Sequence, residues 1–272
     1  MPEGPEVKRQ ADRVGRALED QIALEVFFGL SKLADAGPSL SGVRVTGVQS
    51  RSKALLVHFE DGRSVYTHGQ LYGRWKVVGA DTHPRSNRQL RFMVRTERKK
   101  ALLYSASEIE ILDTDALDAH PYLSKLGPEA LDTAVSEDAL LERLESDRFH
   151  RRQLAALLLD QSFVAGLGNY LRSEILYFAG VLPEHRPADV STAARRRLAH
   201  EVLEVTRRAY AMDGITMEEG DTTALKADGV PKRGRRHMVF GREGAPCRRC
   251  RTPVEKRRTG GRNIFVCSSC QT

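Results

Sequence analysis

The stretch Phe163-Val-Ala-Gly-Leu-Gly-Asn169 constrains the fold more than any other part of this sequence, because it joins two segments with helical periodicity. Before it, residues 151–161 place three leucines on one face of a helix. After it, Leu171, Ile175 and Phe178 form an apolar stripe at a similar spacing. The stretch therefore predicts two helices joined by a tight turn.

Gly166 and Gly168 allow this turn a tight backbone conformation that is strained for larger residues. Asn169 is well suited to cap the second helix. A helix N-terminus presents free amides, and nearby glycines permit the close approach of a phosphate group. The plainer interpretation is a helical hairpin whose glycines only turn the chain. The pattern alone favours that plainer interpretation, so other features must decide.

The residues upstream of the turn indicate a β-rich half that begins with one helix. Val7, Ala11, Val14 and Leu18 recur at helical spacing and share one face. Short apolar segments bounded by turn signals predict strands at 43–48, 54–59, 64–66, 74–78, 90–96 and 101–105. We interpret this half as a β-sandwich with a helix at its N-terminus.

The rest of the chain indicates a helical half. Residues 113–135 are rich in Asp, Pro and Gly, which is typical of a connection, and amphipathic helices are predicted at 136–144 and 191–211. Residues 213–236 are polar and end in the basic run Lys232-Arg-Gly-Arg-Arg236. We expect a mobile, solvated loop there, with contact to a nucleic acid as the alternative.

The composition favours a polyanionic partner. Lys and Arg number 43 against 36 Asp and Glu, a formal net charge of +7, and each basic side chain placed on a phosphate releases a condensed counterion. A protein that merely happens to be basic is an equal alternative on charge alone. The sequence has no long apolar run and no export signal, so we expect no membrane span and a cytoplasmic location.

All four cysteines fall near the C-terminus, as Cys247-Arg-Arg-Cys250 and Cys267-Ser-Ser-Cys270. Two residues between paired cysteines direct both sulfurs to one point, and two such pairs complete a tetrahedral shell for zinc. Thr259-Gly-Gly261 supplies a turn between the pairs, so a zinc β-hairpin finger is predicted. The set leaves no open position, so one structural zinc ion is expected. Two disulfides or free thiols are the alternative.

The chain starts Met1-Pro-Glu-Gly-Pro-Glu6. A small second residue favours removal of Met1, which would leave Pro2 with a free secondary amine. An α-amino group has a pKa of about 8, so about a tenth of it is unprotonated and nucleophilic at pH 7. Glu3 would sit beside that nucleophile, where a carboxyl group can shuttle protons. The alternative is a start without a chemical role, whose acids favour the first turn of a helix.

Together and in this order, these features resemble the formamidopyrimidine-DNA glycosylase and endonuclease VIII family across nearly the whole chain. The resemblance rests on the proline–glutamate start, on Gly166-Leu-Gly-Asn-Tyr170 and on the four-cysteine hairpin. Within the family the chain is more similar to bacterial endonuclease VIII. It carries Gly4 where the other branch usually has Leu, and it contains His68-Gly-Gln-Leu-Tyr-Gly73.

The fold that the resemblance implies is α+β. An N-terminal helix plus β-sandwich domain is followed by a C-terminal helical domain with a helix–two-turn–helix motif and a zinc β-hairpin finger. The implied domains are a catalytic β-sandwich at 1–124, a helical DNA-binding domain at 125–236 and a zinc finger at 237–272.

The resemblance also implies roles for individual residues. Pro2 would form a Schiff base with the sugar, and Glu3 would act as general acid and base. Lys53 would hold phosphate and assist β-elimination, while Arg262 would bind phosphate and support δ-elimination. The implied DNA-binding residues are Gln70, Leu71, Tyr72, Lys125 and Asn169, the implied supporting acids are Glu6 and Glu174, and the implied zinc ligands are Cys247, Cys250, Cys267 and Cys270.

The implied function is that of a bifunctional DNA glycosylase and AP lyase of base-excision repair, acting on oxidised pyrimidines or abasic sites in double-stranded DNA. We expect a monomer in the bacterial cytoplasm, associated with the nucleoid through DNA. One alternative is the same chemistry on oxidised purines such as 8-oxoguanine and formamidopyrimidines. A second is a DNA-damage-binding zinc protein without catalysis.

The sequence departs from the family at two places. Lys125 stands where endonuclease VIII can carry Arg, which keeps the charge but removes a bidentate grip on phosphate. Residues 213–236 are longer and more basic than the family leads us to expect, which puts the substrate preference in doubt.

Overall fold

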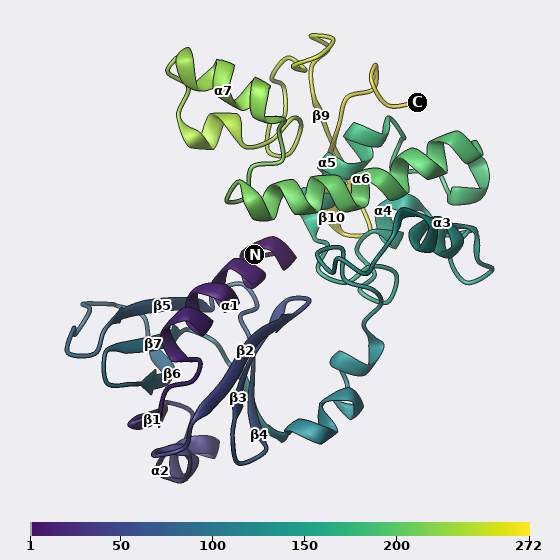
Figure 1. Ribbon diagram of the computed structural model, residues 1–272. Helices are drawn as coiled ribbons and strands as arrows, with labels where there is room; N and C mark the ends of the chain where they lie inside the picture. Colours follow the sequence, from purple (N-terminus) through teal and green to yellow (C-terminus); the bar gives the residue numbers. More distant parts are fainter. Residues whose placement is uncertain (1) are drawn as a thin grey trace. The chain divides into compact units, whose positions relative to one another are not determined.

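The computed structural model describes residues 2–272, and the chain divides into two compact units. Unit 1 comprises Pro2 and Glu6–Lys125, and unit 2 comprises Glu3–Pro5 and Leu126–Thr272. Figure 1 shows that strands make up most of the first unit and helices most of the second. The predicted order, a β-rich half and then a helical half, is confirmed.

Unit 1 is a helix followed by two four-stranded antiparallel sheets. Helix α1 (Gly4–Leu18) comes first, and the sheets have the strand orders β1-β6-β7-β5 and β2-β3-β4-β8. The strands are β1 (Glu25–Phe28), β2 (Val45–Arg51), β3 (Ala54–Phe59), β4 (Arg63–His68), β5 (Arg74–Gly79), β6 (Leu90–Arg95), β7 (Lys99–Tyr104) and β8 (Glu108–Asp113). Short helical turns are η1 (Ser31–Ala36), α2 (Gly37–Leu40), η2 (Thr114–Ala119) and η3 (Leu123–Lys125).

The two sheets and one face of α1 enclose the hydrophobic core of unit 1. The predicted stripe of Val7, Ala11, Val14 and Leu18 is buried and packs with residues of both sheets. Strands β1 and β8 were not predicted. In β1 the exposed position 27 is occupied by Phe, so polar and apolar residues do not alternate in its sequence. The β-sandwich with a helix at its N-terminus is therefore confirmed.

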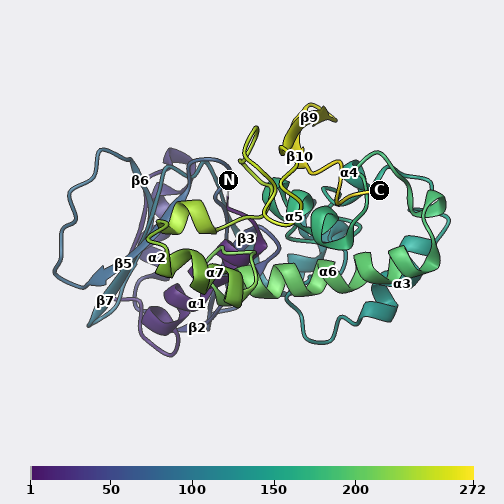
Figure 2. The same ribbon diagram turned by 90° about the horizontal axis from the view of Figure 1, so that it is seen from above.

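Unit 2 is built from helices and one two-stranded hairpin. Its elements are α3 (Glu137–Glu145), α4 (Leu154–Leu157), α5 (Asn169–Ala179), η4 (Pro187–Asp189), α6 (Thr192–Ala211), α7 (Glu219–Ala227), η5 (Lys232–Arg235), β9 (Glu255–Thr259) and β10 (Arg262–Val266). Helix α6 packs against α3 and α5, and β10 lies along α5 (Figure 2). Ser136 and Ser191 cap α3 and α6 by accepting a hydrogen bond from the amide three residues later.

Two secondary-structure predictions for unit 2 were wrong. The helix expected at 151–161 is reduced to the single turn α4, because the amides of Leu154 and Ala155 bind the carbonyls of His185 and Pro183 instead of forming a longer helix. Residues 213–236, expected to be a loop, contain α7 and η5. The start of this segment is fixed by Ile215 and Met217, which are buried in a hydrophobic cluster with residues of the hairpin.

The predicted β-hairpin near the C-terminus is confirmed. Strands β9 and β10 pair in antiparallel register, with Thr259 opposite Arg262. Gly260 and Gly261 between them have φ values of 59° and 76°, a turn conformation that glycine adopts without strain. The hairpin belongs to unit 2, and its division into a third domain stays a prediction. None of the described helices is both long and apolar enough to cross a membrane.

Candidate active site

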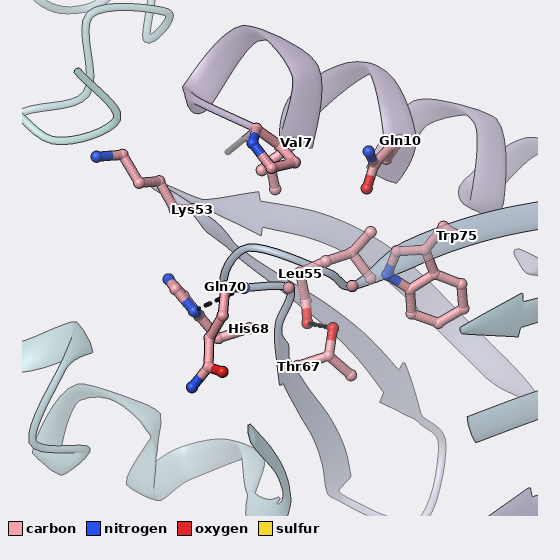
Figure 3. Close-up of a pocket in the computed structure, with 11 residues that line it drawn as sticks. Val7, Gln10, Lys53, Leu55, Thr67, His68, Gln70 and Trp75 are labelled. Carbon is pink, nitrogen blue, oxygen red and sulfur yellow. Dashed lines mark hydrogen bonds between the residues drawn. The ribbon is translucent and has the colours of Figure 1, made fainter. Parts of the chain in front are cut away.

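A pocket in unit 1 brings together three of the residues singled out in the sequence. Pro2, Lys53 and Gln70 all line it, and His68 and Trp75 complete much of its wall. Figure 3 shows side chains of α1 on one side of the pocket and side chains of the sheet on the other. Met1 lies outside the described residues, so its removal stays a prediction.

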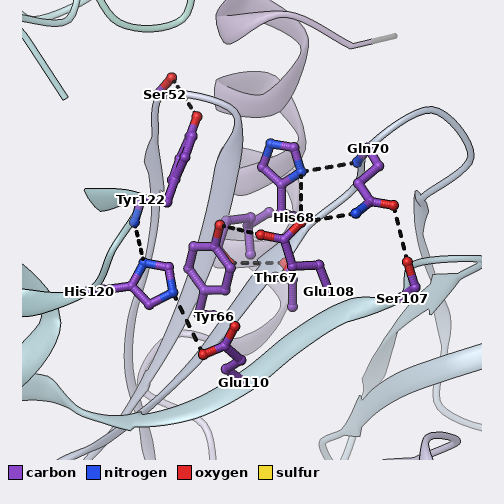
Figure 4. Close-up of polar contacts among 11 residues, drawn as sticks. Ser52, Tyr66, Thr67, His68, Gln70, Ser107, Glu108, Glu110, His120 and Tyr122 are labelled. Carbon is purple, nitrogen blue, oxygen red and sulfur yellow. Dashed lines mark hydrogen bonds and ion pairs between the residues drawn. The ribbon is translucent and has the colours of Figure 1, made fainter. Parts of the chain in front are cut away.

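Lys53 occupies a tight turn between β2 and β3. Arg51 pairs with Ala54, which leaves Ser52 and Lys53 as the two turn residues, and Ser52 has a φ of 60°. The Tyr122 hydroxyl donates a hydrogen bond of 3.1 Å to the Ser52 hydroxyl (Figure 4). The strained turn, held from the side by Tyr122, therefore presents Lys53 at the pocket.

The turn after β4 carries the predicted DNA-contact loop. The Gly73 amide donates to the Gly69 carbonyl at 2.6 Å, and a Cβ atom at Gly73 would lie 2.4 Å from the Gly69 Cα. This close approach requires glycine. Leu71 and Tyr72 are 59% and 68% exposed, so neither side chain packs in the core.

Glu3 is a buried carboxylate of unit 2 and caps helix α5. Its Oε1 accepts from the Tyr170 amide at 2.9 Å and its Oε2 from the Leu171 amide at 3.3 Å. These are two of the amides that a helix N-terminus leaves without an intrahelical partner. The prediction that Asn169 caps this helix was wrong, because Gly168 takes the N-cap position and Glu3 supplies the acceptor.

The two glycines of the turn make room for Glu3. A Cβ atom at Gly168 would lie 2.2 Å from the Glu3 Cδ, far closer than the van der Waals contact distance of two carbon atoms. The Gly4 amide donates to the Gly166 carbonyl at 2.8 Å, which places the two backbones against each other. The glycines therefore do more than turn the chain: they form the seat that receives residues 3 and 4.

Asn169 binds the hairpin through a residue that was not predicted. Its Nδ2 donates to the Asn263 carbonyl at 2.8 Å, and its Oδ1 accepts from Arg172 at 2.7 Å. Arg172 is fully buried and also donates to the carbonyls of Ala155 and Asn263. Burial first, and the charge of Arg262 second, lower the pKa of Arg172 to about 10. A charged residue among the mostly apolar residues of this helix was the sequence signal for this role.

Glu174 is fully buried and is committed to the segment that follows α7. Its carboxylate accepts from the amides of Met238, Val239 and Phe240 at 2.7–2.9 Å and from the Thr216 hydroxyl at 2.6 Å. These contacts hold the segment between α6 and the hairpin against α5. Glu174 therefore has a structural task that its sequence position did not predict.

The other predicted residues lie in separate places. Glu6 is half-buried in the first turn of α1, and Lys125 is exposed at the end of η3. Arg262 is exposed at the first position of β10. Glu6 and Lys125 belong to unit 1 and Arg262 to unit 2.

The basic run at 232–236 lines a second pocket, within unit 2. Arg233 and Arg236 of the run border it, with His237, Phe240 and Arg242. Burial lowers the pKa of His237, so its imidazole is neutral near pH 7. The pocket joins guanidinium groups with an aromatic ring, a combination that suits a planar or anionic group.

The four cysteines form one cluster. Their sulfur atoms all lie within 4.8 Å of one another, with Cys247 and Cys270 at 3.9 Å and Cys250 and Cys267 at 3.3 Å. A tetrahedron of sulfurs about 2.3 Å from a zinc ion has edges of about 3.8 Å, which this cluster fits. A disulfide needs about 2.05 Å, so the disulfide alternative is wrong. The cluster is able to hold a metal ion.

Comparisons with known proteins agree along the whole chain. The model of the formamidopyrimidine-DNA glycosylase N-terminal domain matches residues 1–107, and that of the H2TH domain of the same family matches 126–221. The chain is 42% identical over 271 residues to Endonuclease 8 of Escherichia coli O17:K52:H18 and to that of Shigella sonnei, with 100% of each chain covered. Among solved structures, it is similar to Lactococcus lactis Fpg (MutM) in a complex with N7-benzyl-Fapy-dG containing DNA, with a TM-score of 0.82, 22% identity and 99% of both chains covered. At that identity the structural likeness shows the fold.

Proposed function

Because this chain belongs to the formamidopyrimidine-DNA glycosylase and endonuclease VIII family, we propose that it is a bifunctional DNA glycosylase and AP lyase that removes oxidised pyrimidines. The observation that carries the proposal is the pocket that places Pro2 beside Lys53 and Gln70. Identity of 42% to Endonuclease 8 over the full length supports the pyrimidine preference.

The proposed reaction begins with the amine of Pro2, once Met1 has been removed. The amine attacks C1′ of the damaged nucleotide and loses its N–H proton, and the base leaves with the glycosidic electron pair and takes up a proton. The C1′–O4′ bond then breaks as the nitrogen lone pair forms the C1′=N bond of the iminium, and O4′ takes up a proton. The resulting iminium acidifies C2′, so loss of a C2′ proton expels the 3′ phosphate, and a second elimination expels the 5′ phosphate. Water then hydrolyses the imine and frees the enzyme. Both strand ends would carry phosphates.

Four residues would carry these steps. Pro2 is the nucleophile, and Glu3, its neighbour in the chain, transfers the protons. Lys53 holds the phosphate beside the lesion and assists the first elimination. Arg262 binds phosphate and supports the second elimination. Its positive charge also lowers the pKa of Arg172 at the start of α5.

The proposed DNA contacts are of two kinds, polar contacts to the DNA and an apolar wedge inserted between the bases. Asn169, at the amide-rich start of α5, binds backbone phosphate, and Lys125 adds charge. Leu71 and Tyr72 fill the gap left by the extruded nucleotide, because an apolar wedge offsets the cost of unstacking. Gln70 contacts the DNA beside them. The acids Glu6 and Glu174 would support these groups without touching the substrate.

The proposed cofactor is one zinc ion held by the four cysteines. It has no open coordination position, so its task is to stabilise the hairpin that carries Arg262. We further propose that the protein acts as a monomer on damaged or abasic double-stranded DNA in the bacterial cytoplasm, associated with the nucleoid. The net charge of +7 supports a polyanionic partner.

The test is a duplex oligonucleotide with one thymine glycol, incubated with the protein and sodium borohydride, which reduces an imine to a stable bond. The expected result is a covalent protein–DNA band from protein whose Pro2 terminus is verified by intact mass. Pro2→Glu, whose bulky second residue keeps Met1 in place, should abolish the band. Pro38→Ala, an exposed proline in α2, is the matched control and should leave it unchanged.

The same trap separates the alternatives. A band on 8-oxoguanine that forms faster than the band on thymine glycol would identify an oxidised-purine enzyme. Tight binding to every damaged duplex, with no band from a verified Pro2 terminus on any lesion or on an abasic site, would identify a silent binder and contradict the proposed chemistry.

A further inference from the structure

Polar residues outside the loop 69–73, which follows β4, form hydrogen bonds to it (Figure 4). The Gln70 amide is bound at both ends: its Nε2 donates to the Glu108 carboxylate at 3.0 Å, and its Oε1 accepts from the Ser107 hydroxyl at 3.1 Å. Ser107 and Glu108 stand together at the start of β8. The amide can therefore adopt one orientation only.

The far side of the loop is held by a second segment. Arg88, in the connection between β5 and β6, donates from its guanidinium to the Tyr72 carbonyl at 2.9 Å. The backbone N–H of Gln70 donates to His68 Nδ1 at 3.3 Å. Gln70 has a φ of 47°, in the left-handed region that non-glycine residues rarely adopt, so a conformation with an inherent cost is maintained by these contacts.

We infer that Arg88, Ser107 and Glu108 are positioning residues, which we call the loop clamp. They hold the 69–73 turn in its binding conformation before DNA binds. The inference rests on the proposed function, because it assigns the clamp the task of projecting Leu71 and Tyr72 as a wedge. A wedge that is already ordered loses less conformational entropy on binding. The clamp residues contact the loop and have no proposed contact with the reacting atoms.

The clamp leaves Gln70 able to contact DNA. A side-chain amide has two N–H donors and a carbonyl oxygen with two lone pairs. The bonds to Glu108 and Ser107 use one donor and one lone pair. Gln70 is therefore oriented by the clamp and keeps one donor and one acceptor for the DNA.

One clamp residue also has a structural contact, which governs the choice of variants. Glu108 accepts a hydrogen bond of 3.2 Å from the hydroxyl of Tyr66, whose side chain is fully buried. Glu108→Ala alone would leave that buried hydroxyl without its acceptor, so this change is combined with Tyr66→Phe. Arg88→Ala and Ser107→Ala change exposed residues and leave the core intact.

The first experiment needs no DNA and measures hydrogen–deuterium exchange of the amides of Leu71, Tyr72 and Gly73 by NMR. Arg88→Ala and the double variant Tyr66→Phe/Glu108→Ala should each accelerate exchange at Gly73 by roughly threefold or more. Glu108→Gln keeps an acceptor for Gln70 and should stay near the wild-type rate. Glu60→Ala, an exposed carboxylate at the end of β3, is the matched control. Unchanged exchange in Arg88→Ala and in the double variant would overturn the inference.

The second experiment links the clamp to catalysis, with the borohydride trap under single-turnover conditions. Arg88→Ala should raise the protein concentration needed for half-maximal trapping by about tenfold, a coupling of about 1.4 kcal/mol, while the rate at saturation stays the same. A lower saturating rate with unchanged half-saturation would contradict a positioning role. If wild-type protein traps no lesion, the proposed function has failed, whereas the exchange measurement still judges the clamp.

Discussion

Glu3 accepts a hydrogen bond of 2.9 Å from the backbone amide of Tyr170, which joins the start of the chain to a helix 167 residues later. Because a helix N-terminus carries a partial positive charge, it stabilises a carboxylate at this position. Glu3 is also bonded covalently to Pro2, so any change that displaces Glu3 acts on the proposed nucleophile. The Gly-Leu-Gly turn and the proline–glutamate start, which are far apart in the sequence, form one structural feature.

Gly168→Ala should disrupt this feature. Its new Cβ would lie 2.2 Å from the Glu3 Cδ, so the carboxylate must leave the helix amides. The loss of two charge-assisted hydrogen bonds should lower the free energy of unfolding by about 2–4 kcal/mol, and borohydride trapping should fall at least about tenfold. Chemical denaturation and single-turnover trapping would measure the two effects.

The control for this change is Gly220→Ala. Gly220 lies in α7, and a Cβ atom added there meets nothing within 4 Å. The substitution should stabilise the protein by about 0.5–1 kcal/mol and leave trapping unchanged. Equal trapping by the Gly168 and Gly220 variants would show that Glu3 does not need its seat.

Glu174→Ala should destabilise unit 2 more than any single exposed substitution. It would remove the acceptor of three backbone amides that lie against α5, at a cost of about 3–5 kcal/mol. Thr216→Val removes only one hydroxyl bonded to the same carboxylate and should cost about 1 kcal/mol. Denaturation curves of the two variants test the ranking, and a smaller loss for Glu174→Ala than for Thr216→Val would refute it.

The fold could be predicted from the sequence wherever a periodic pattern was long. Helix α1, most strands and α6 follow from side chains that repeat over several turns or alternations. The pattern failed at α4, where one turn buries Leu154 and Leu157 and tertiary hydrogen bonds take the neighbouring amides. It also failed at α7, whose polar composition hides the buried anchors Ile215 and Met217 that precede it.

The site was predicted through motif residues, and the partners of those residues were not. The motif identified Glu3 and Gly168 but not their contact, since nothing local in the sequence relates positions 3 and 168. Arg172 and Glu108 were missed for the same reason: each matters through partners distant in the sequence. The alternation of a strand predicts which face is buried, but it does not predict which polar groups meet there.

Stability should fall as the pH drops below about 6.5 because His237 is buried. Burial is the largest cause of its lowered pKa, with the charge of Arg236 acting in the same direction and Glu174 opposing. Below about pH 6.5 the unfolded chain binds a proton that the folded chain excludes, so the stability contributed by neutral His237 is lost as the pH falls toward its folded pKa. The slope cannot exceed about 1.4 kcal/mol per pH unit for one proton.

His237→Asn tests this assignment. Asn does not titrate, and its side-chain amide can still reach the Thr216 hydroxyl that lies 3.1 Å from the His237 Nδ1. The variant should show a shallower dependence of the free energy of unfolding on pH between about 5 and 7. His83→Asn, in the exposed connection after β5, should keep the wild-type dependence. Parallel curves for all three proteins would exclude His237 as the titrating group.

Removal of the proposed zinc ion should unfold the hairpin and thereby loosen the start of α5. Cys247 and Cys267 are buried in the cluster that also holds Met238 and Val254, so the metal site and this small core depend on each other. Elemental analysis should find about one zinc per chain. A chelator should lower the melting temperature by about 10 °C or more, because metal binding supplies much of the folding free energy of such small elements.

Loss of the metal should then weaken catalysis through the hairpin, since the Asn263 carbonyl next to Arg262 binds both Asn169 and Arg172. Cys250→Ser, which changes the exposed ligand, should reduce bound zinc and trapping on an abasic duplex together. Ser269→Ala, between the last two cysteines, should change neither. If Cys250→Ser lost its zinc and still trapped at the wild-type rate, the hairpin would not position Asn169 for DNA binding, and this prediction would be wrong.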